Sequence, residues 1–319
     1  MSRREYLQIA GVFGAAALLG TTMSTTLSGQ DATPKPDAAR FRLCLNTSTI
    51  RGQELPLEQE IEIASNAGFT GIEPWISEIE NAVGRGISLA ELRTRINDAG
   101  LTVEGAIGFA RWIVNDDIER QRGLDEMKKD MDLVRELGGT RIAAPPAGMQ
   151  DEGSSPLDLL EAADRYRAIL ELGDETGVTP MIEVWGFSKN VARLGEAALI
   201  AIESQHPKAC ILTDVYHLHK GGSDARSLKL LSGPALPVMH FNDYPGEKTR
   251  TELNDSDRVY PGDGIAPLTE ILHILRDIGF DGALSLELFN KSYWKDDAST
   301  VAKTGIAKMK QAIAAAFPG

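Results

Sequence analysis

Four residues that can bind a metal ion or move a proton each follow a short apolar segment. They are Glu183, Asp214, His240 and Glu287, and the segments before them are Pro180-Met-Ile, Cys210-Ile-Leu-Thr, Pro237-Val-Met and Leu284-Ser-Leu. Short apolar segments between glycine or proline breaks and polar loops are typical of buried strands in a parallel sheet. We therefore expect the four side chains to meet at one edge of that sheet. Three carboxylates and one imidazole suit a hard divalent ion such as Mn²⁺, Mg²⁺ or Co²⁺.

A repeat of strands and helices is needed to position those residues. Several segments have a glycine at the end of an amphipathic helix and an apolar strand after it, as in Ala67-Gly-Phe and Ile278-Gly-Phe. Glycine just past a helix supplies the left-handed cap. Apolar residues three or four apart predict buried helix faces, for example Leu160, Ala163, Tyr166 and Leu170.

We predict strands near 41–46, 69–73, 101–107, 140–145, 179–184, 209–214, 236–242 and 282–288. Eight alternating units predict a closed (β/α)8 TIM barrel, whose active site lies at the carboxyl ends of the strands. A doubly wound open sheet is the alternative fold. It is disfavoured because no G-x-G-x-x-G turn follows the first strand, which runs Leu43-Cys-Leu-Asn-Thr-Ser-Thr49.

The chain is acidic, with 46 acidic and 33 basic residues and a formal net charge of -13. Such a surface repels the phosphate backbone that dominates nucleic-acid affinity, so nucleic acid is excluded as a partner. Its two cysteines, Cys44 and Cys210, each fall inside a predicted strand. We expect them to be buried free thiols that pack as small hydrophobic groups.

The N-terminal segment resembles a twin-arginine signal peptide. Ser2-Arg-Arg-Glu-Tyr-Leu-Gln8 is followed by an apolar stretch from Ile9 to Gly20, which is too short to cross about 30 Å of hydrocarbon. We predict a signal peptide over 1–30, a linker over 31–40 and the barrel over 41–319. These boundaries imply export through the twin-arginine translocase to the periplasm or beyond, with no stable membrane anchor after cleavage.

Glu183, the Asp214-Val-Tyr-His217 segment, His240-Phe-Asn-Asp243, the Asp257-to-Gly264 loop and Glu287 together resemble the sugar phosphate isomerase/epimerase family of xylose isomerase-like TIM barrels. The resemblance implies that Glu183, Asp214, His240 and Glu287 bind one divalent ion, with Mn²⁺ favoured over Mg²⁺, Co²⁺ and Zn²⁺. It also implies that Glu183 and Glu287 exchange protons with the substrate and that His217 contacts a substrate oxygen. An arginine after the seventh strand should also bind the substrate, and we favour Arg258 over Arg250. Endonuclease IV-like repair enzymes of the same superfamily use extra histidines to bind three zinc ions. This chain has only five histidines, which are too few to build such a trinuclear site.

These residue types suit chemistry next to a carbonyl group. A divalent ion stabilises the negative charge that develops when the adjacent carbon loses its proton, and two carboxylates can act as base and acid. We expect isomerisation or epimerisation of an unphosphorylated keto sugar or cyclitol through an enediolate. A lyase or dehydratase acting on a 3-keto glycoside or inosose would use the same intermediate, and a non-catalytic sugar-binding barrel is the third alternative. No glycine-rich cradle or basic cluster for phosphate is evident.

Other residues at predicted strand ends could contact the sugar. All four tryptophans follow predicted strands, and we favour Trp112 and Trp185 as aromatic faces for a sugar ring. Glu73 ends the second strand and is expected either to bind a substrate hydroxyl or to orient a ligand of the metal. Small barrels of this kind often pair, so a homo-oligomer is also an expectation.

Overall fold

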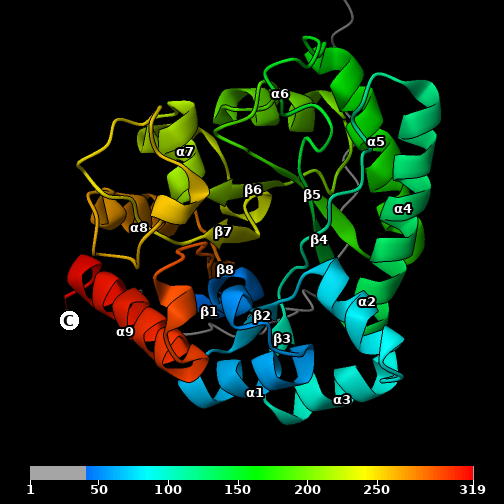
Figure 1. Cartoon of the computed structure of the whole chain (residues 1–319). Helices are drawn as coiled ribbons and strands as arrows, with labels where there is room; N and C mark the ends of the chain where they lie inside the picture. The colour runs from blue at the N-terminus through cyan, green and yellow to red at the C-terminus, as the bar shows by residue number, and fades with distance from the viewer. Residues whose placement is uncertain (1–40, 319) are drawn as a thin grey trace, which may run out of the picture. The chain divides into compact units, whose positions relative to one another are not determined.

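The computed structural model describes residues 41–318, and all statements about the structure refer to this part of the chain. The predicted signal peptide and linker lie outside it and stay predictions. The described residues form eight parallel strands surrounded by helices (Figure 1). The strands are β1 Arg42–Asn46, β2 Gly71–Glu73, β3 Thr102–Val103, β4 Arg141–Ala144, β5 Thr179–Glu183, β6 Ile211–Asp214, β7 Val238–His240 and β8 Ala283–Leu286. Each lies within the range predicted for it.

The helices follow the strands in alternation, with two helices between β2 and β3. They are α1 Leu57–Ala67, α2 Ile76–Gly84, α3 Leu89–Asp98, α4 Asp117–Glu136, α5 Leu159–Thr176, α6 Leu194–Glu203, α7 Val215–Gly221, α8 Leu268–Asp277 and α9 Ala298–Ala316. Asp116, Asp158 and Asp297 cap α4, α5 and α9 through their side chains, which satisfies backbone amides that have no partner inside the helix.

The strand order is β3-β2-β1-β8-β7-β6-β5-β4. A hydrogen bond from Ala143 N to Ala106 O, 2.8 Å long, joins the two ends of this sheet. The predicted (β/α)8 barrel is therefore confirmed. Because all the strands run in the same direction, the residues that end them lie at one rim of the barrel.

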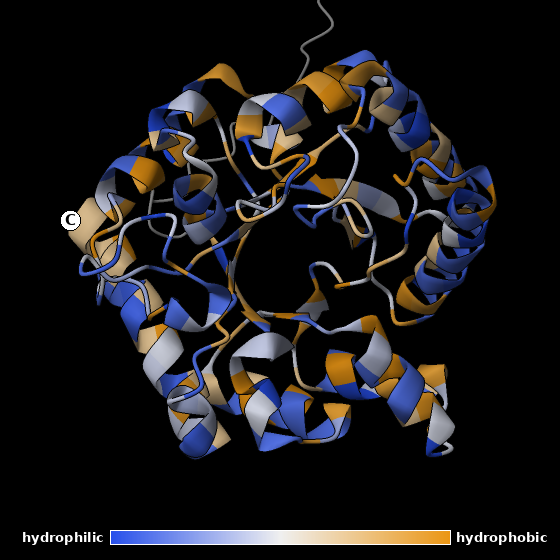
Figure 2. Cartoon of the chain, turned by 45° about the horizontal axis from the view of Figure 1, so that its top comes forward, coloured by the Kyte–Doolittle hydropathy of each residue, from blue (hydrophilic) through white to orange (hydrophobic). Residues whose placement is uncertain are grey.

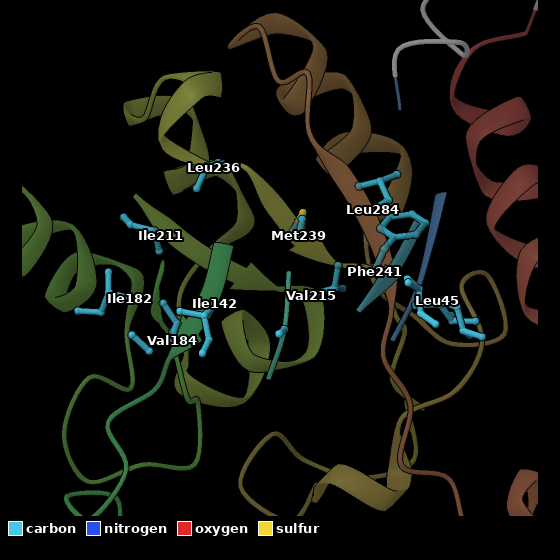
Figure 3. Packing of buried hydrophobic residues seen from close by; sticks show 14 of the residues in the cluster. Leu45, Ile142, Ile182, Val184, Ile211, Val215, Leu236, Met239, Phe241 and Leu284 are labelled. Carbon is cyan, nitrogen blue, oxygen red and sulfur yellow. The ribbon is translucent and has the colours of Figure 1, made fainter. Parts of the chain in front are cut away.

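Side chains alternate between the inside of the barrel and the layer beneath the helices, as the period of two along a strand requires. Cys44, Met181, Leu212, Val238 and Ala283 belong to the interior cluster. Their neighbours Leu45, Ile182, Ile211, Met239 and Leu284 instead pack in the larger core (Figure 3). A residue two positions after an interior residue also points inward, which directs Glu183, Asp214 and His240 into the barrel. Both cysteines are buried and free, as predicted.

The helices around the barrel carry both polar and apolar residues (Figure 2). In α5, Ala163, Tyr166 and Leu170 are buried as predicted, but Leu160 is 59% exposed. Leu160 lies in the first turn, so the buried face of α5 begins one turn later than the sequence indicated. None of the helices between residues 41 and 318 has both the length and the apolarity needed to cross a bilayer.

Candidate active site

The register of the strands assembles a layer of polar side chains at the carboxyl rim. Asp214 on β6 is paired with His240 on β7, and His240 is paired with Ser285 on β8. Next to β8 on its other edge, Asn46 on β1 is paired with Glu73 on β2. All five side chains are essentially inaccessible to solvent. A buried polar layer of this kind requires each group to find a partner in the protein or in a ligand.

Asp214, His240 and Glu287 form a compact group whose ligand atoms all lie within 4.8 Å of one another. His240 Nδ1 lies 3.0 Å from Glu287 Oε2 and 3.6 Å from Asp214 Oδ2, yet it makes no aligned hydrogen bond. An imidazole nitrogen buried between two carboxylates, with no aligned hydrogen bond, belongs to a donor set that suits a divalent ion. Of the four predicted ligands, the structure brings these three together. Glu183 lines the adjoining cavity outside this group.

Glu73 holds His240 from behind. Its Oε2 lies 3.0 Å from His240 Nε2 and accepts hydrogen bonds from Asn46 Nδ2 at 3.0 Å and Ser285 Oγ at 2.8 Å. Glu73 is fully buried and is not a lining residue of the cavity, a position that suits the predicted role in orienting a ligand better than the predicted contact with a substrate hydroxyl. A carboxylate on one imidazole nitrogen fixes the ring and leaves the other nitrogen free for a metal.

Arg258 lies at the centre of the site with a side chain that is 1% exposed. Its Nη1 donates to Asp214 Oδ2 at 2.9 Å and Glu287 Oε2 at 2.6 Å. Its Nη2 donates to Asp255 Oδ1 at 2.7 Å and lies 3.0 Å from His217 Nε2. Arg250 instead donates to the backbone oxygen of Lys220. The structure thus places Arg258, the arginine that we favoured, beside the acidic residues.

His217 is positioned by Asp214 and by the loop after β5. Asp214 Oδ1 accepts from His217 N at 2.9 Å and so caps α7. Gly186 N donates to His217 Nδ1 at 3.2 Å. A Cβ on Gly186 would lie 2.3 Å from His217 O, so only glycine allows this approach. His217 lines the cavity, and its contact with a substrate oxygen stays a prediction.

The ionisable groups of the site have strongly perturbed pKa values. Burial raises the pKa of Glu183 to about 8, despite the nearby His240. Burial also tends to raise the pKa values of Glu287 and Asp214, but nearby basic groups outweigh it. His240 and Arg258 hold the pKa of Glu287 below its ordinary value. Arg258 and His217 hold the pKa of Asp214 well below its ordinary value. The pKa of His240 is raised well above normal because Glu287 and Glu73 outweigh its burial. Two carboxyl groups with pKa values displaced in opposite directions therefore line one cavity.

The cavity above these groups has a volume of about 220 Å³. Its polar side chains are Glu183, His217, Asp255, Arg258 and Glu287, and its remaining lining residues are Trp75, Ile107, Phe109, Trp185, Phe187 and Phe289. Trp185 therefore lines the cavity, and its contact with a sugar ring stays a prediction.

The expectation for Trp112 is wrong. Its side chain is fully buried and packs against Tyr166, with ring centroids 5.9 Å apart. Its Nε1 donates to Pro145 O at 3.0 Å. The loop after β3 turns Trp112 into the protein core rather than toward the barrel mouth, and Trp112 is not a lining residue of the cavity.

Several residues of the site were missed by the sequence reasoning. Asn46 bridges Glu73 and Glu287 through Nδ2, and Asn242 Nδ2 donates to Asp214 Oδ2 at 3.1 Å. Both positions carry a recognisable signal, because Asn46 ends the first strand and Asn242 follows His240 by two residues. Phe289 follows Glu287 by the same two-residue spacing, whereas Asp255, Phe109 and Phe187 lie in the segments between strands and helices and carry no such signal.

Comparison with known proteins identifies the family. Residues 61–312 match the model of the xylose isomerase-like TIM barrel. The chain belongs to this family.

Relatives within the family have different activities. An inosose isomerase of Bacillus velezensis is 24% identical over 265 residues, which cover 83% of this chain and 94% of that protein. A 3-dehydroshikimate dehydratase of Pseudomonas putida is 22% identical over 74% of this chain and 36% of that protein. Among solved structures, the IolI protein with a bound zinc atom superposes with a TM-score of 0.79 at 23% identity, covering 88% of this chain and all of that one.

Proposed function

We propose that this protein is a divalent-metal-dependent isomerase or epimerase of an unphosphorylated keto sugar or cyclitol. The observation that carries the proposal is the pair of cavity-lining carboxyl groups beside the Asp214, His240 and Glu287 group. Glu183 has a pKa raised to about 8, and Glu287 has a lowered one. A proton donor and a proton acceptor of different strength beside one substrate carbon suit reversible proton transfer.

Asp214, His240 and Glu287, joined by Glu183 at the same rim, are the residues that would hold the metal. The Nδ1 of His240, which faces two carboxylates without an aligned hydrogen bond, and the oxygen-rich donor set favour a hard or borderline divalent ion, with Mn²⁺ as our first choice. When bound, the ion supplies Lewis acidity that stabilises negative charge on the substrate oxygens.

The protein's own residues carry out the proton transfers. His240 and Arg258 lower the pKa of Glu287, so this carboxyl group is ionised and is suited to accept a proton from the carbon next to the carbonyl group. Glu183, whose pKa is raised to about 8 in the metal-free protein, lines the same cavity and is suited to return one. His217 and Arg258 line the same cavity and can donate hydrogen bonds to an enediolate oxygen. The roles of the two glutamates would exchange in the reverse direction.

Solvent exchange tests this function. Incubation of the Mn²⁺-loaded protein with inosose and unphosphorylated ketohexoses in D₂O should incorporate deuterium next to the carbonyl group, without loss of carbon or water. Glu183→Gln and Glu287→Gln should each abolish exchange, whereas Glu175→Gln, an exposed residue on α5, should not. Full activity in both site variants would refute the acid/base assignment.

A dehydratase or lyase is the second candidate, and the likeness to the 3-dehydroshikimate dehydratase favours it. An enediolate can expel a group from the next carbon, and nothing in the arrangement of Asp214, His240 and Glu287 prevents this outcome. Mass spectrometry separates the two functions, because loss of water or of an aglycone from a 3-keto glycoside or inosose would identify the lyase. A barrel that binds sugar but gives neither result would be a non-catalytic binding protein.

We further propose that residues 1–30 direct export through the twin-arginine pathway. Arg3 and Arg4 are followed by the short apolar stretch Ile9 to Gly20. Replacing both arginines by lysine should retain the precursor in the cytoplasm, as shown by cell fractionation. Unchanged export would remove this proposal and leave the proposed activity untouched.

A further inference from the structure

The cavity divides into a polar floor and an apolar upper wall. The floor holds the ionisable groups already described. The wall consists of Ile107 and five aromatic residues, Trp75, Phe109, Trp185, Phe187 and Phe289, which we call the aromatic collar. These five follow strands β2, β3, β5 and β8 at the carboxyl rim. Hydroxyl groups of a bound molecule can find partners at the floor, but the wall presents little except carbon.

The collar is continuous. Ring centroids are 6.0 Å apart between Phe289 and Trp75, 5.0 Å between Trp75 and Phe109, 6.1 Å between Phe109 and Trp185, and 5.2 Å between Trp185 and Phe187. Contacts at these distances form a connected aromatic surface.

The polar atoms of the two tryptophans already have partners in the protein. Trp75 Nε1 donates to Asn46 Oδ1 at 3.1 Å, and the Trp185 side chain interacts with the carboxyl group of Glu183. A second sugar ring against the collar would therefore find few hydrogen-bond partners for its hydroxyl groups, and each unpaired buried hydroxyl is unfavourable. An apolar ring would lose nothing in this way.

Two collar residues are incompletely covered. Phe109 is 39% exposed and Phe187 is 42% exposed, one on each side of Trp185. The cavity itself, at about 220 Å³, is larger than the cavity of roughly 150 Å³ that holds a benzene ring and smaller than the roughly 300 Å³ of pockets that enclose drug-sized ligands. One six-membered ring fits inside, and a substituent on it would extend between the two exposed phenyl groups.

We propose that the substrate carries an apolar planar group, such as an aryl substituent, at the end remote from its reacting carbons, and that the aromatic collar binds this group. The inference rests on the proposed function for the orientation of the sugar, and it names the substrate class: a sugar or cyclitol derivative with an aromatic substituent. Phe109 and Phe187 are then residues that determine specificity.

Isothermal titration calorimetry tests the collar with three probes on the full-length, Mn²⁺-loaded protein. The probes are methyl β-D-glucopyranoside, phenyl β-D-glucopyranoside and cellobiose. The phenyl glycoside should bind at least about tenfold more tightly than the methyl glycoside, as burial of one aromatic ring against others predicts. It should also bind more tightly than cellobiose. Equal affinities, tighter binding of cellobiose or no detectable binding of the phenyl glycoside would overturn the proposal.

Variants locate the effect. Phe109→Ala and Phe187→Ala should each reduce the phenyl-to-methyl preference several-fold, whereas Ile202→Ala, which truncates an apolar side chain that is 68% exposed on α6, should preserve it. An unchanged preference in both phenylalanine variants would also overturn the proposal. Glu183→Gln should retain the preference although turnover is lost. If wild-type protein shows the preference but no solvent exchange, the proposed activity fails while the collar stands.

Discussion

Replacing Glu183 by glutamine should stabilise the metal-free protein at neutral pH. Burial raises the pKa of this carboxyl group from 4.5 to about 8 in the folded state. Below pH 4.5 the group is protonated in both folded and unfolded protein and has no effect on stability. Between pH 4.5 and 8 the unfolded state ionises while the folded state retains its proton, so the free energy of unfolding falls as the pH rises. Above pH 8 the loss is constant.

The magnitude follows from the same two pKa values. Each pH unit in this interval lowers the free energy of unfolding by about 1.4 kcal/mol, which gives a loss of about 3 kcal/mol at pH 7 and less than about 1 kcal/mol at pH 5. Glutamine cannot ionise and avoids the loss. For a domain of this size the difference at pH 7 corresponds to a rise in Tm of about 6 °C.

Scanning calorimetry in EDTA at pH 5 and pH 7 measures the effect. The Tm of Glu183→Gln should exceed that of the wild type at pH 7 and approach it at pH 5, with Glu175→Gln as the control. Addition of Mn²⁺ should reverse the order, because the variant lacks one proposed ligand. A difference that does not change with pH, or a variant less stable than the wild type at both pH values, would refute the reasoning.

Three further results are expected. Removal of metal with EDTA should stop solvent exchange and lower the Tm, and Mn²⁺ at one hundred times its Kd should restore about 2.7 kcal/mol of stability; an unchanged Tm would contradict metal binding. Glu73→Gln should weaken Mn²⁺ binding about 10- to 100-fold by calorimetry, because Glu73 orients His240; unchanged affinity would show that this contact is dispensable. Trp112→Phe should lower the free energy of unfolding by about 1–3 kcal/mol, since Pro145 O loses its buried donor. Its KM should not change, and a raised KM would restore the predicted sugar contact.

The barrel and the metal-site candidates could be predicted because one periodicity governs both. Inward and outward side chains alternate along each strand, so Met181 and Glu183, or Leu212 and Asp214, share the interior face. The end of each apolar segment marked the rim. Each of Asp214, His240 and Glu287 could be assigned to the end of a particular strand. That assignment was enough to predict that the three residues lie within reach of one another.

The loops could not be predicted in the same way, and Trp112 illustrates why. A Cβ on Gly123 of α4 would lie 2.5 Å from the carbonyl carbon of Arg111, so this helix touches the loop backbone next to Trp112. That close approach accompanies the burial of Trp112 against Tyr166 of α5. Contacts between segments so far apart in the chain leave no local pattern, and the strand-end position of Trp112 was therefore misleading.

The choice between two arginines also depended on a loop. Asp243 accepts hydrogen bonds from the backbone amides of Tyr244, Gly262, Gly264 and Ala266, and its own backbone pairs with Val259. These bonds fix the segment next to Arg258. Proximity in the sequence to the seventh strand favours Arg250 as much as Arg258. The hydrogen bonds of Asp243 instead fix the segment that places Arg258 beside Asp214 and Glu287.

Charge balance connects these features to the proposed metal. Arg258 contacts Asp214, Glu287 and Asp255, and His240 lies between Glu287 and Glu73, so the two basic groups offset part of the negative charge of four carboxylates. Glu183 makes no ion pair with either of them among the described residues, which is consistent with its raised pKa. The charge of the site is therefore partly balanced before a metal arrives, while Glu183 is protonated near neutral pH.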